Sequence, residues 1–316
     1  MQTFLAPYAD ALNDMVAASA EIDWVNLEPA LGSAAHLDWA DDVDASPWTT
    51  NALRRADRHG LLLLDAAASA FASVARWSRG PCDFPVLMAG LRVSIEANAL
   101  AGSLLSPRLT ARQRLEHFAN LSLQDLSYRN SYFKALRKVT GSGYDLERSW
   151  LQQEIKELTE TAKALLEVVP SVATDGVQFL GKRGSAQQRL EDLFEDVSPS
   201  GKMAQAHALA WYSLVSAPAH SSVSSVRLRF TAETEGTEGR RRVDIPTEHV
   251  TAALLLTATT QLRAEAMLLE RFGLGDQHFP NRALQGLDDA SRRLTEVAVA
   301  VESRARGAYP TGDTSS

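Results

Sequence analysis

The sequence predicts an all-α protein, a helical bundle with one small antiparallel β-hairpin near residues 226–245. Apolar residues recur at spacings of three and four through most of the chain, which indicates about seven to nine helices. Alanine and leucine, which favour helices, are abundant. The alternation of apolar and polar residues that is typical of a half-buried strand is clear only in the predicted hairpin.

Composition narrows the class of protein. The chain has 316 residues, of which 45 % are hydrophobic, enough to bury a substantial core. Its net charge of -7 argues against a protein whose entire surface tracks nucleic acid, although a local basic patch is compatible with it. The single cysteine, Cys82, can form no internal disulfide and no cysteine-built metal site.

No segment resembles a targeting signal or a membrane span. The first residues carry no basic stretch, and the longest compact apolar run, LLLL at 61–64, is far shorter than the ~20 residues that cross a bilayer. We therefore expect a cytoplasmic protein.

The first two long helices are separated by a proline-containing break. A helix is predicted from Thr49 to residue 80, where RGPCDFP interrupts the chain. A second helix follows at 84–105, and Pro107 separates it from the next one.

The middle of the chain predicts an antiparallel pair of helices. Residues 109–138 form one helix, which stops at GSG, 141–143, and the charged segment 145–169 forms the other. Two long helices joined by a short turn pair most economically side by side. An irregular connection at 170–185 and a short helix near 186–196 follow.

The predicted hairpin carries a concentration of positive charge. Its two strands alternate apolar residues with arginines on either side of an acidic, glycine-containing loop. Such a cluster is a candidate anion-binding site. The favoured alternative is a solvated or oligomer-facing hairpin, because acidic residues of the loop can neutralise the arginines and few aromatic residues lie among them. The arginines concerned are Arg227, Arg229, Arg240, Arg241 and Arg242.

Two further long helices and a tail complete the chain. The helices are predicted at 246–273 and 281–306. A weak boundary at 80–85 divides an N-terminal helical extension, residues 1–83, from a helical core at 84–306. Residues 307–316 are predicted to be a disordered tail.

A polar cluster is predicted inside the bundle. Arg92 and Glu96 lie four residues apart in an apolar helix, so a pair of this kind needs further hydrogen-bond partners. Ser216 and His220, beside an apolar helix-like run, can supply them. One interpretation of the cluster is a structural group of hydrogen-bonded side chains that fixes helix register. The other is a functional site, and His220 itself is a candidate base, anion contact or helix cap.

The segments around this cluster carry a resemblance. LRVSIEANAL, followed much later by WYSLVSAPAHSS, resembles the paired signature of HEPN-like helical proteins. The chain is most similar to a widespread, largely uncharacterised actinobacterial branch, in which a segment like KRGSAQQRLEDLFEDV precedes the histidine segment. The resemblance covers about residues 84–270, and it implies a helical fold more than an activity.

Ribonucleases of this wider group use an Arg followed four to six residues later by a His, and Arg112 and His117 fit that spacing. In such a site the Arg stabilises the phosphate while the His exchanges a proton with the attacking or leaving oxygen. The alternative is a solvated helix face, because five residues apart is not a shared face of an ideal helix.

A second class of enzyme has weaker support. DDVD at 41–44 resembles the aspartate-rich element that binds magnesium diphosphate in terpene cyclases, with Asp41 and Asp42 as the metal ligands. The second metal motif of terpene cyclases is matched only in part, by DDASRRLTE at 288–296, in which the last acid is one position too late. The remaining histidines are scattered, and neither a G-x-S-x-G elbow nor a phosphate-binding glycine loop is present.

The sequence therefore predicts a HEPN-like interaction or RNA-handling protein, with the non-enzymatic version favoured and no cofactor. The alternatives are a metal-independent ribonuclease and a magnesium-dependent terpenoid enzyme. Apolar positions on several faces of the helices at 49–79 and 247–272 predict a homodimer in which one of them packs against a second copy. The partner is expected to be RNA or a protein.

Overall fold

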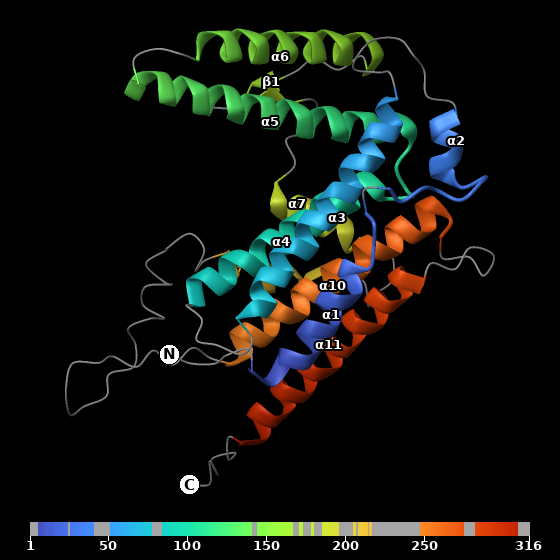
Figure 1. Cartoon of the computed structure of the whole chain (residues 1–316), viewed down its shortest axis with the longest axis vertical. Helices are drawn as coiled ribbons and strands as arrows, with labels where there is room; N and C mark the ends of the chain where they lie inside the picture. The colour runs from blue at the N-terminus through green and yellow to red at the C-terminus, as the bar shows by residue number, and fades with distance from the viewer. Residues whose placement is uncertain are drawn as a thin grey trace.

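The fold is all-α, as predicted (Figure 1). The computed structural model describes residues 6–24, 26–40, 51–77, 84–140, 144–166, 171–172, 178–179, 185–195, 205–206, 208–213, 215–216, 247–274 and 282–308. In chain order these residues form η1 (Ala6–Tyr8), α1 (Ala9–Ala20), α2 (Ala34–Ala40), α3 (Ala52–Arg76), α4 (Phe84–Leu105), α5 (Ala111–Thr140), α6 (Asp145–Leu166), β1 (Ser171–Val172), β2 (Gln178–Phe179), α7 (Ala186–Leu193), α10 (Thr247–Phe272) and α11 (Arg282–Ala308).

The described residues form two regions, which we call the body and the arm. The body is a bundle of α1, α3, α4, α10 and α11, with the short α2 and α7 packed on it. The arm is the antiparallel pair of α5 and α6, which extends from one end of the bundle (Figure 1). The predicted pairing of these two helices is confirmed.

One hydrophobic core runs through the body. Its largest fully buried apolar side chains come from both sides of residue 83, so the predicted N-terminal extension packs into the same core as the rest. They include Tyr8, Leu12, Leu61, Leu64, Phe71, Leu87, Met88, Phe194 and Phe272. The predicted division into an extension and a separate core domain stays a prediction.

Helices α3 and α4 approach closely because a glycine lies at their contact. A Cβ atom added to Gly60 would lie 2.7 Å from Cγ of Leu105, closer than packed atoms allow. The start of α4 lies against the end of α3, where Gly90 meets Val74. The two helices are therefore antiparallel, and α4 lies between α3 and α10.

Helix α10 is the centre of the body. It packs against α2, α4, α7 and α11, and most of its residues from Val250 to Leu268 are buried. It ends where predicted, at Gly273, whose φ of +65° suits a residue without a side chain. The amide of Leu274 then donates to the carbonyl of Leu269 at 3.0 Å, which closes the last turn.

The arm has its own small core. Ala119, Leu123 and Leu126 of α5 pack against the buried face of α6, which runs along Leu151, Ile155, Leu158, Ala162 and Leu166. A separate cluster of Ala56, Leu104 and Phe118 joins the base of α5 to α3 and α4. We call this contact the joint.

Some predicted boundaries are corrected. Helix α3 begins at Ala52 and not at Thr49, because Asn51 has a left-handed φ of 52° that interrupts the helix. Helix α11 continues to Ala308, two residues into the predicted tail. The connection predicted to be irregular contains the short antiparallel pair β1 and β2, in which Ser171 faces Phe179.

The predicted hairpin at 226–245 and residues 309–316 of the predicted tail lie outside the described residues. Among the helices within the described ranges, none combines the length and the apolar character that a bilayer crossing requires.

Candidate functional site

The predicted pair of Arg92 and Glu96 forms on α4. Nε of Arg92 donates to Oε1 of Glu96 at 2.6 Å, and both side chains are mostly but not completely buried. The hydroxyl of Tyr212 donates to the same carboxylate oxygen at 2.6 Å. The pair therefore gains the third partner that a partly buried ion pair needs, from a residue 116 positions away.

The electrostatics of this cluster follow from its partial burial. Burial raises the pKa of the Tyr212 phenol, and the hydrogen bond to Glu96 acts in the same direction. Burial alone would lower the pKa of Arg92, but the hydrogen bond and the charge of Glu96 outweigh it, so that pKa is raised.

Ser216 is also in this cluster, one helical turn after Tyr212. It lies close enough to lower the pKa of Tyr212, although its buried Oγ makes no hydrogen bond of good geometry within the described residues. His220 lies outside the described residues, so its predicted place in the cluster stays a prediction. Sequence reasoning did not include Tyr212 in the cluster. A four-residue spacing from Ser216 places both side chains on one helix face, and this spacing was the available signal.

Arg112 and His117 do not form a pair. The guanidinium of Arg112 donates to the carbonyl of Leu166 at the end of α6. Nδ1 of His117 lies 2.8 Å from the carbonyl oxygen of Ser103 on α4. The two side chains thus bond to backbone carbonyls of different helices, and their predicted role as a ribonuclease pair stays a prediction.

His117 lines a groove of mixed polar and apolar character between α4, α5 and α7, to which Met267 of α10 also contributes. Two adjoining hollows of about 220 and 270 Å³ share Ser103, His117 and Asp192. Ser106, Arg108 and Glu195 line the first hollow, and Asn120, Gln188 and Arg189 line the second. Arg112 lines neither of them. We call this feature the His117 groove.

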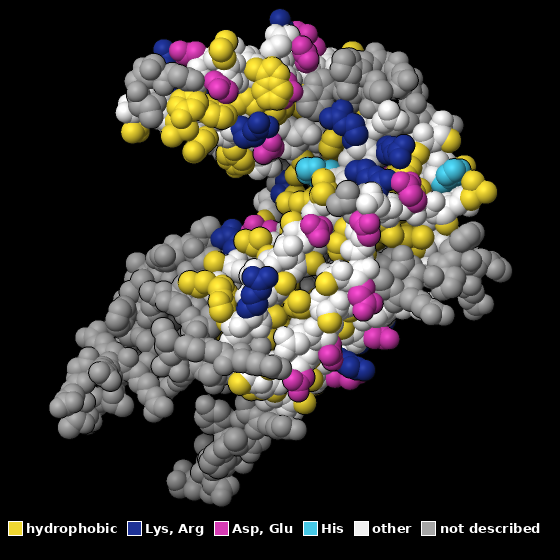
Figure 2. Space-filling model, in the orientation of Figure 1, with side chains coloured by type: hydrophobic (Ala, Val, Ile, Leu, Met, Phe, Trp, Pro, Cys, Tyr) yellow, Lys and Arg dark blue, Asp and Glu magenta, His cyan; other side chains and the backbone are white. Residues whose placement is uncertain are grey.

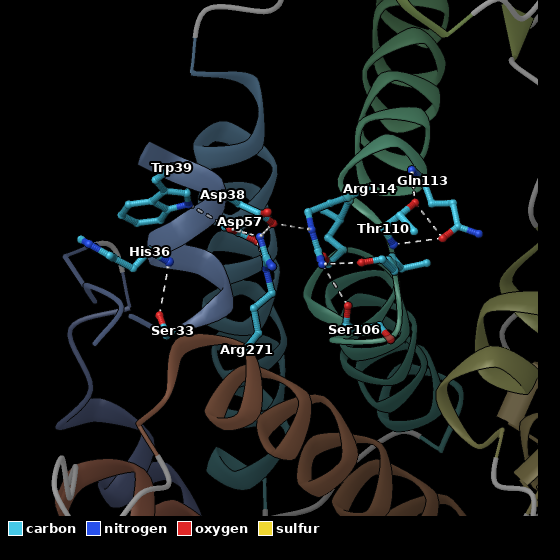
Figure 3. Close-up of polar contacts among 12 residues, drawn as sticks. Ser33, His36, Asp38, Trp39, Asp57, Ser106, Thr110, Gln113, Arg114 and Arg271 are labelled. Atoms are coloured by element: carbon cyan, nitrogen blue, oxygen red, sulfur yellow. Dashed lines mark hydrogen bonds and ion pairs between the residues drawn. The ribbon is translucent and has the colours of Figure 1, made fainter. Parts of the chain in front are cut away.

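The most deeply buried charges lie elsewhere, next to the joint (Figure 3). Arg271 of α10 binds Asp57 of α3 through two parallel hydrogen bonds of 2.7 Å, and its Nη2 also donates to Asp38 of α2 at 2.8 Å. Nε1 of Trp39 donates to Asp57 at 2.9 Å. Arg271 is 1 % exposed and Asp57 0 %, so this ion pair is shielded from solvent, while Asp38 is 27 % exposed.

Arg114 of α5 extends the network toward the arm. Its Nε lies 4.0 Å from Asp38, and its other nitrogens donate to the carbonyls of Leu104, Ser106 and Leu109 at the end of α4. Burial lowers the pKa of Arg114 to about 10, and the charge of Arg271 acts in the same direction while Asp57 and Asp38 oppose it. We call these two arginines and two aspartates the joint network.

Sequence reasoning missed the joint network. Its one local signal was Asp57, which lies four residues from Leu53 and four from Leu61 on the apolar stripe of α3, where a charged side chain requires a buried partner. Within the described residues the network bonds to itself, to Trp39 and to backbone carbonyls, and it ties together α2, α3, α5 and α10.

The remaining predicted sites lie outside the described residues. These are the hairpin arginines Arg227, Arg229, Arg240, Arg241 and Arg242, and the aspartates of the magnesium alternative, Asp41 and Asp42. Within the described ranges, no group of three or more histidine, cysteine, aspartate or glutamate side chains is placed to hold a metal ion.

Comparison of the chain with family models, with curated proteins and with solved structures gives no match.

Proposed function

We propose that the chain is a HEPN-like helical protein that acts by binding a protein partner through its arm, and that it is not a nuclease built on Arg112 and His117. The observation that carries the proposal is a set of exposed apolar side chains on α5 and α6. These side chains are Tyr128, 51 % exposed, Tyr132, 60 %, Val139, 85 %, Leu146, 85 %, and Trp150, 55 %.

Their distribution supports a binding surface. Figure 2 has hydrophobic side chains gathered over the free end of the arm, away from the body. Aromatic rings there contact one another, since Phe133 packs against Tyr132 at 5.6 Å and against Tyr144 at 5.4 Å between ring centroids. Clustered exposed aromatics mark protein-binding surfaces more often than solvated faces.

The exposed aromatic side chains, and not the charges, favour a protein over RNA. Arg129 lies 3.8 Å from Asp125 and Arg137 lies 2.9 Å from Asp145, but Lys134 and Lys138 of α5 are exposed as well. The arm therefore carries some of the positive charge that a phosphate backbone attracts. RNA remains the second expected partner, and binding to it is an outcome of the test below.

The arm offers a better contact surface for the predicted homodimer than α10 does. The apolar faces of α10 pack against α2, α4, α7 and α11 within one chain, which accounts for the pattern at 247–272 without a second copy. We therefore propose that self-association uses Tyr132 and Trp150 of the arm. The surface predicted at 49–79, where Leu62 of α3 is 49 % exposed, stays the other predicted contact.

The test replaces Tyr132 and Trp150 with serine together. We expect the variant to keep the helical content and melting temperature of the wild type, while it loses the dimer mass in light scattering or a partner captured by the wild type. Leu62→Ser is the matched control, since Leu62 is 49 % exposed on α3, in the body.

An assay panel covers the enzymatic alternatives. RNA is incubated with the protein in chelator, and prenyl diphosphates are incubated with it in magnesium. RNA cleavage that disappears in His117→Ala would contradict the binding proposal, and so would a hydrocarbon product that disappears when Asp41 and Asp42 are replaced.

A further inference from the structure

We propose that the His117 groove is a binding site for a small phosphorylated sugar, that is, a ligand that presents a phosphate together with hydroxyl groups. This inference does not depend on the proposed function of the arm, because the groove is formed by α4, α5 and α7 at the base of α5.

The first step concerns the orientation of His117. The Ser103 carbonyl can only accept a hydrogen bond, so the 2.8 Å contact places the hydrogen of a neutral ring on Nδ1. Nε2 is then the nitrogen available to a ligand, as an acceptor in the neutral ring or as a donor in the protonated one. Such a carbonyl contact fixes the orientation and the tautomer of the ring.

The second step concerns the positive side of the groove. Nη1 of Arg108 donates to the carbonyl of Glu195 at 2.5 Å, which fixes the guanidinium at the edge of the groove. Its remaining N–H groups make no hydrogen bond within the described part of the chain. Arg108 lines the first hollow and Arg189 lines the second, and a planar guanidinium group suits a phosphate.

The third step concerns the acidic side, which excludes a simple anion. Asp192 lines both hollows and Glu195 lines one, so a ligand with phosphate alone would face two carboxylates. A ligand that also has hydroxyl groups can donate hydrogen bonds to these carboxylates. Oδ1 of Asp192 accepts from Nε2 of Gln188 at 3.1 Å, and within the described residues its Oδ2 remains to accept from a ligand hydroxyl.

The fourth step concerns size. Small-molecule sites usually enclose about 300–1,000 Å³, and each hollow alone falls below that range. Because the hollows of about 220 and 270 Å³ adjoin, the groove as a whole reaches its lower part. A sugar phosphate is a ligand of this size, and a long polymer is not needed to fill it.

The test is titration calorimetry of the full chain with ribose 5-phosphate, with ribose and inorganic phosphate as probes of the two halves and glycine as a zwitterion. We expect ribose 5-phosphate to bind more tightly than any of the other three. His117→Asn should weaken its binding about tenfold or more, although the asparagine amide can still donate to the Ser103 carbonyl.

Two further variants separate the roles in the groove. Asp192→Asn should reduce the advantage of ribose 5-phosphate over inorganic phosphate, since it replaces one carboxylate oxygen with an amide NH2 and removes the negative charge that a bare phosphate would face. Arg112→Gln is the matched control on the same helix and should leave binding unchanged, because Arg112 does not line the groove.

Three results would overturn the proposal. One is the absence of ribose 5-phosphate binding at about 10 mM to a folded wild-type protein. Another is binding that His117→Asn and Asp192→Asn leave unchanged. The third is binding of inorganic phosphate or glycine as tight as that of ribose 5-phosphate. None of these results concerns the arm surface, so the proposed function would stand or fall separately.

Discussion

The body and the arm hold their helices together in different ways. In the body, α3, α4 and α10 are packed from several sides, and charge is buried where four helices meet, with Asp57 0 % and Arg271 1 % exposed. In the arm, two helices share a single apolar seam, and ion pairs such as that of Arg129 with Asp125 lie in solvent. A charge can be buried only where enough neighbours surround it to supply hydrogen bonds, and the body meets this condition. The ion pairs of the arm stay in solvent, where each contributes little to stability.

The largest difference between the regions should come from removing a carboxylate. Asp57→Ala leaves Arg271 buried and short of its main partner, and we expect it to lower the free energy of unfolding by about 3–5 kcal/mol in urea denaturation. Asp125→Ala, which breaks the surface pair with Arg129, should cost less than about 0.5 kcal/mol. Equal losses in the two variants would remove the contrast between the regions.

A smaller but more local effect is expected from the core of the arm. Leu151→Ala deletes a fully buried side chain of α6 and should cost about 2–4 kcal/mol of local stability. Hydrogen exchange should then quicken in α5 and α6 while the body stays protected, because the seam of the arm is separate from the main core. Leu254→Ala in α10 is the control, and it should quicken exchange throughout the body.

The smallest effect should come from acidification at the joint. Burial lowers the pKa of His59 below its ordinary value of 6.5, with the charge of Asp125 opposing it, and the ring packs against Phe118 of α5 at 6.0 Å. As the pH falls below 6.5, the unfolded chain takes up a proton that the folded chain resists, so stability should decrease.

His59→Gln should reduce this loss between pH 7.5 and 5.5, measured as the change in urea midpoint. A variant with the same pH dependence as the wild type would show that His59 does not titrate differently in the folded chain.

The sequence predicted local features well and distant contacts poorly. The helix at 84–105 has the predicted bounds, and Arg92 with Glu96 forms because a four-residue spacing places both side chains on one face. A five-residue spacing turns a side chain by about 140°, so Arg112 and His117 bond to different helices.

The features that were missed depend on contacts across the fold. Tyr212 is 116 positions from Glu96, and Arg271 is 214 positions from Asp57. No periodicity in the sequence records which helices become neighbours. The isolated charge of Asp57 on an apolar stripe indicated that a partner was needed, but it could not identify Arg271 as that partner.

Helix α5 runs without interruption from the joint to the free end of the arm. Its 30 residues correspond to a rod about 45 Å long, anchored at Arg114 and Phe118 and exposed at Tyr132. A force that a bound partner applies at the free end of this helix acts as a torque on the anchored end. The arm is thus mechanically connected to the four helices that Arg114, Arg271 and their aspartates tie together, and also to the groove beside His117.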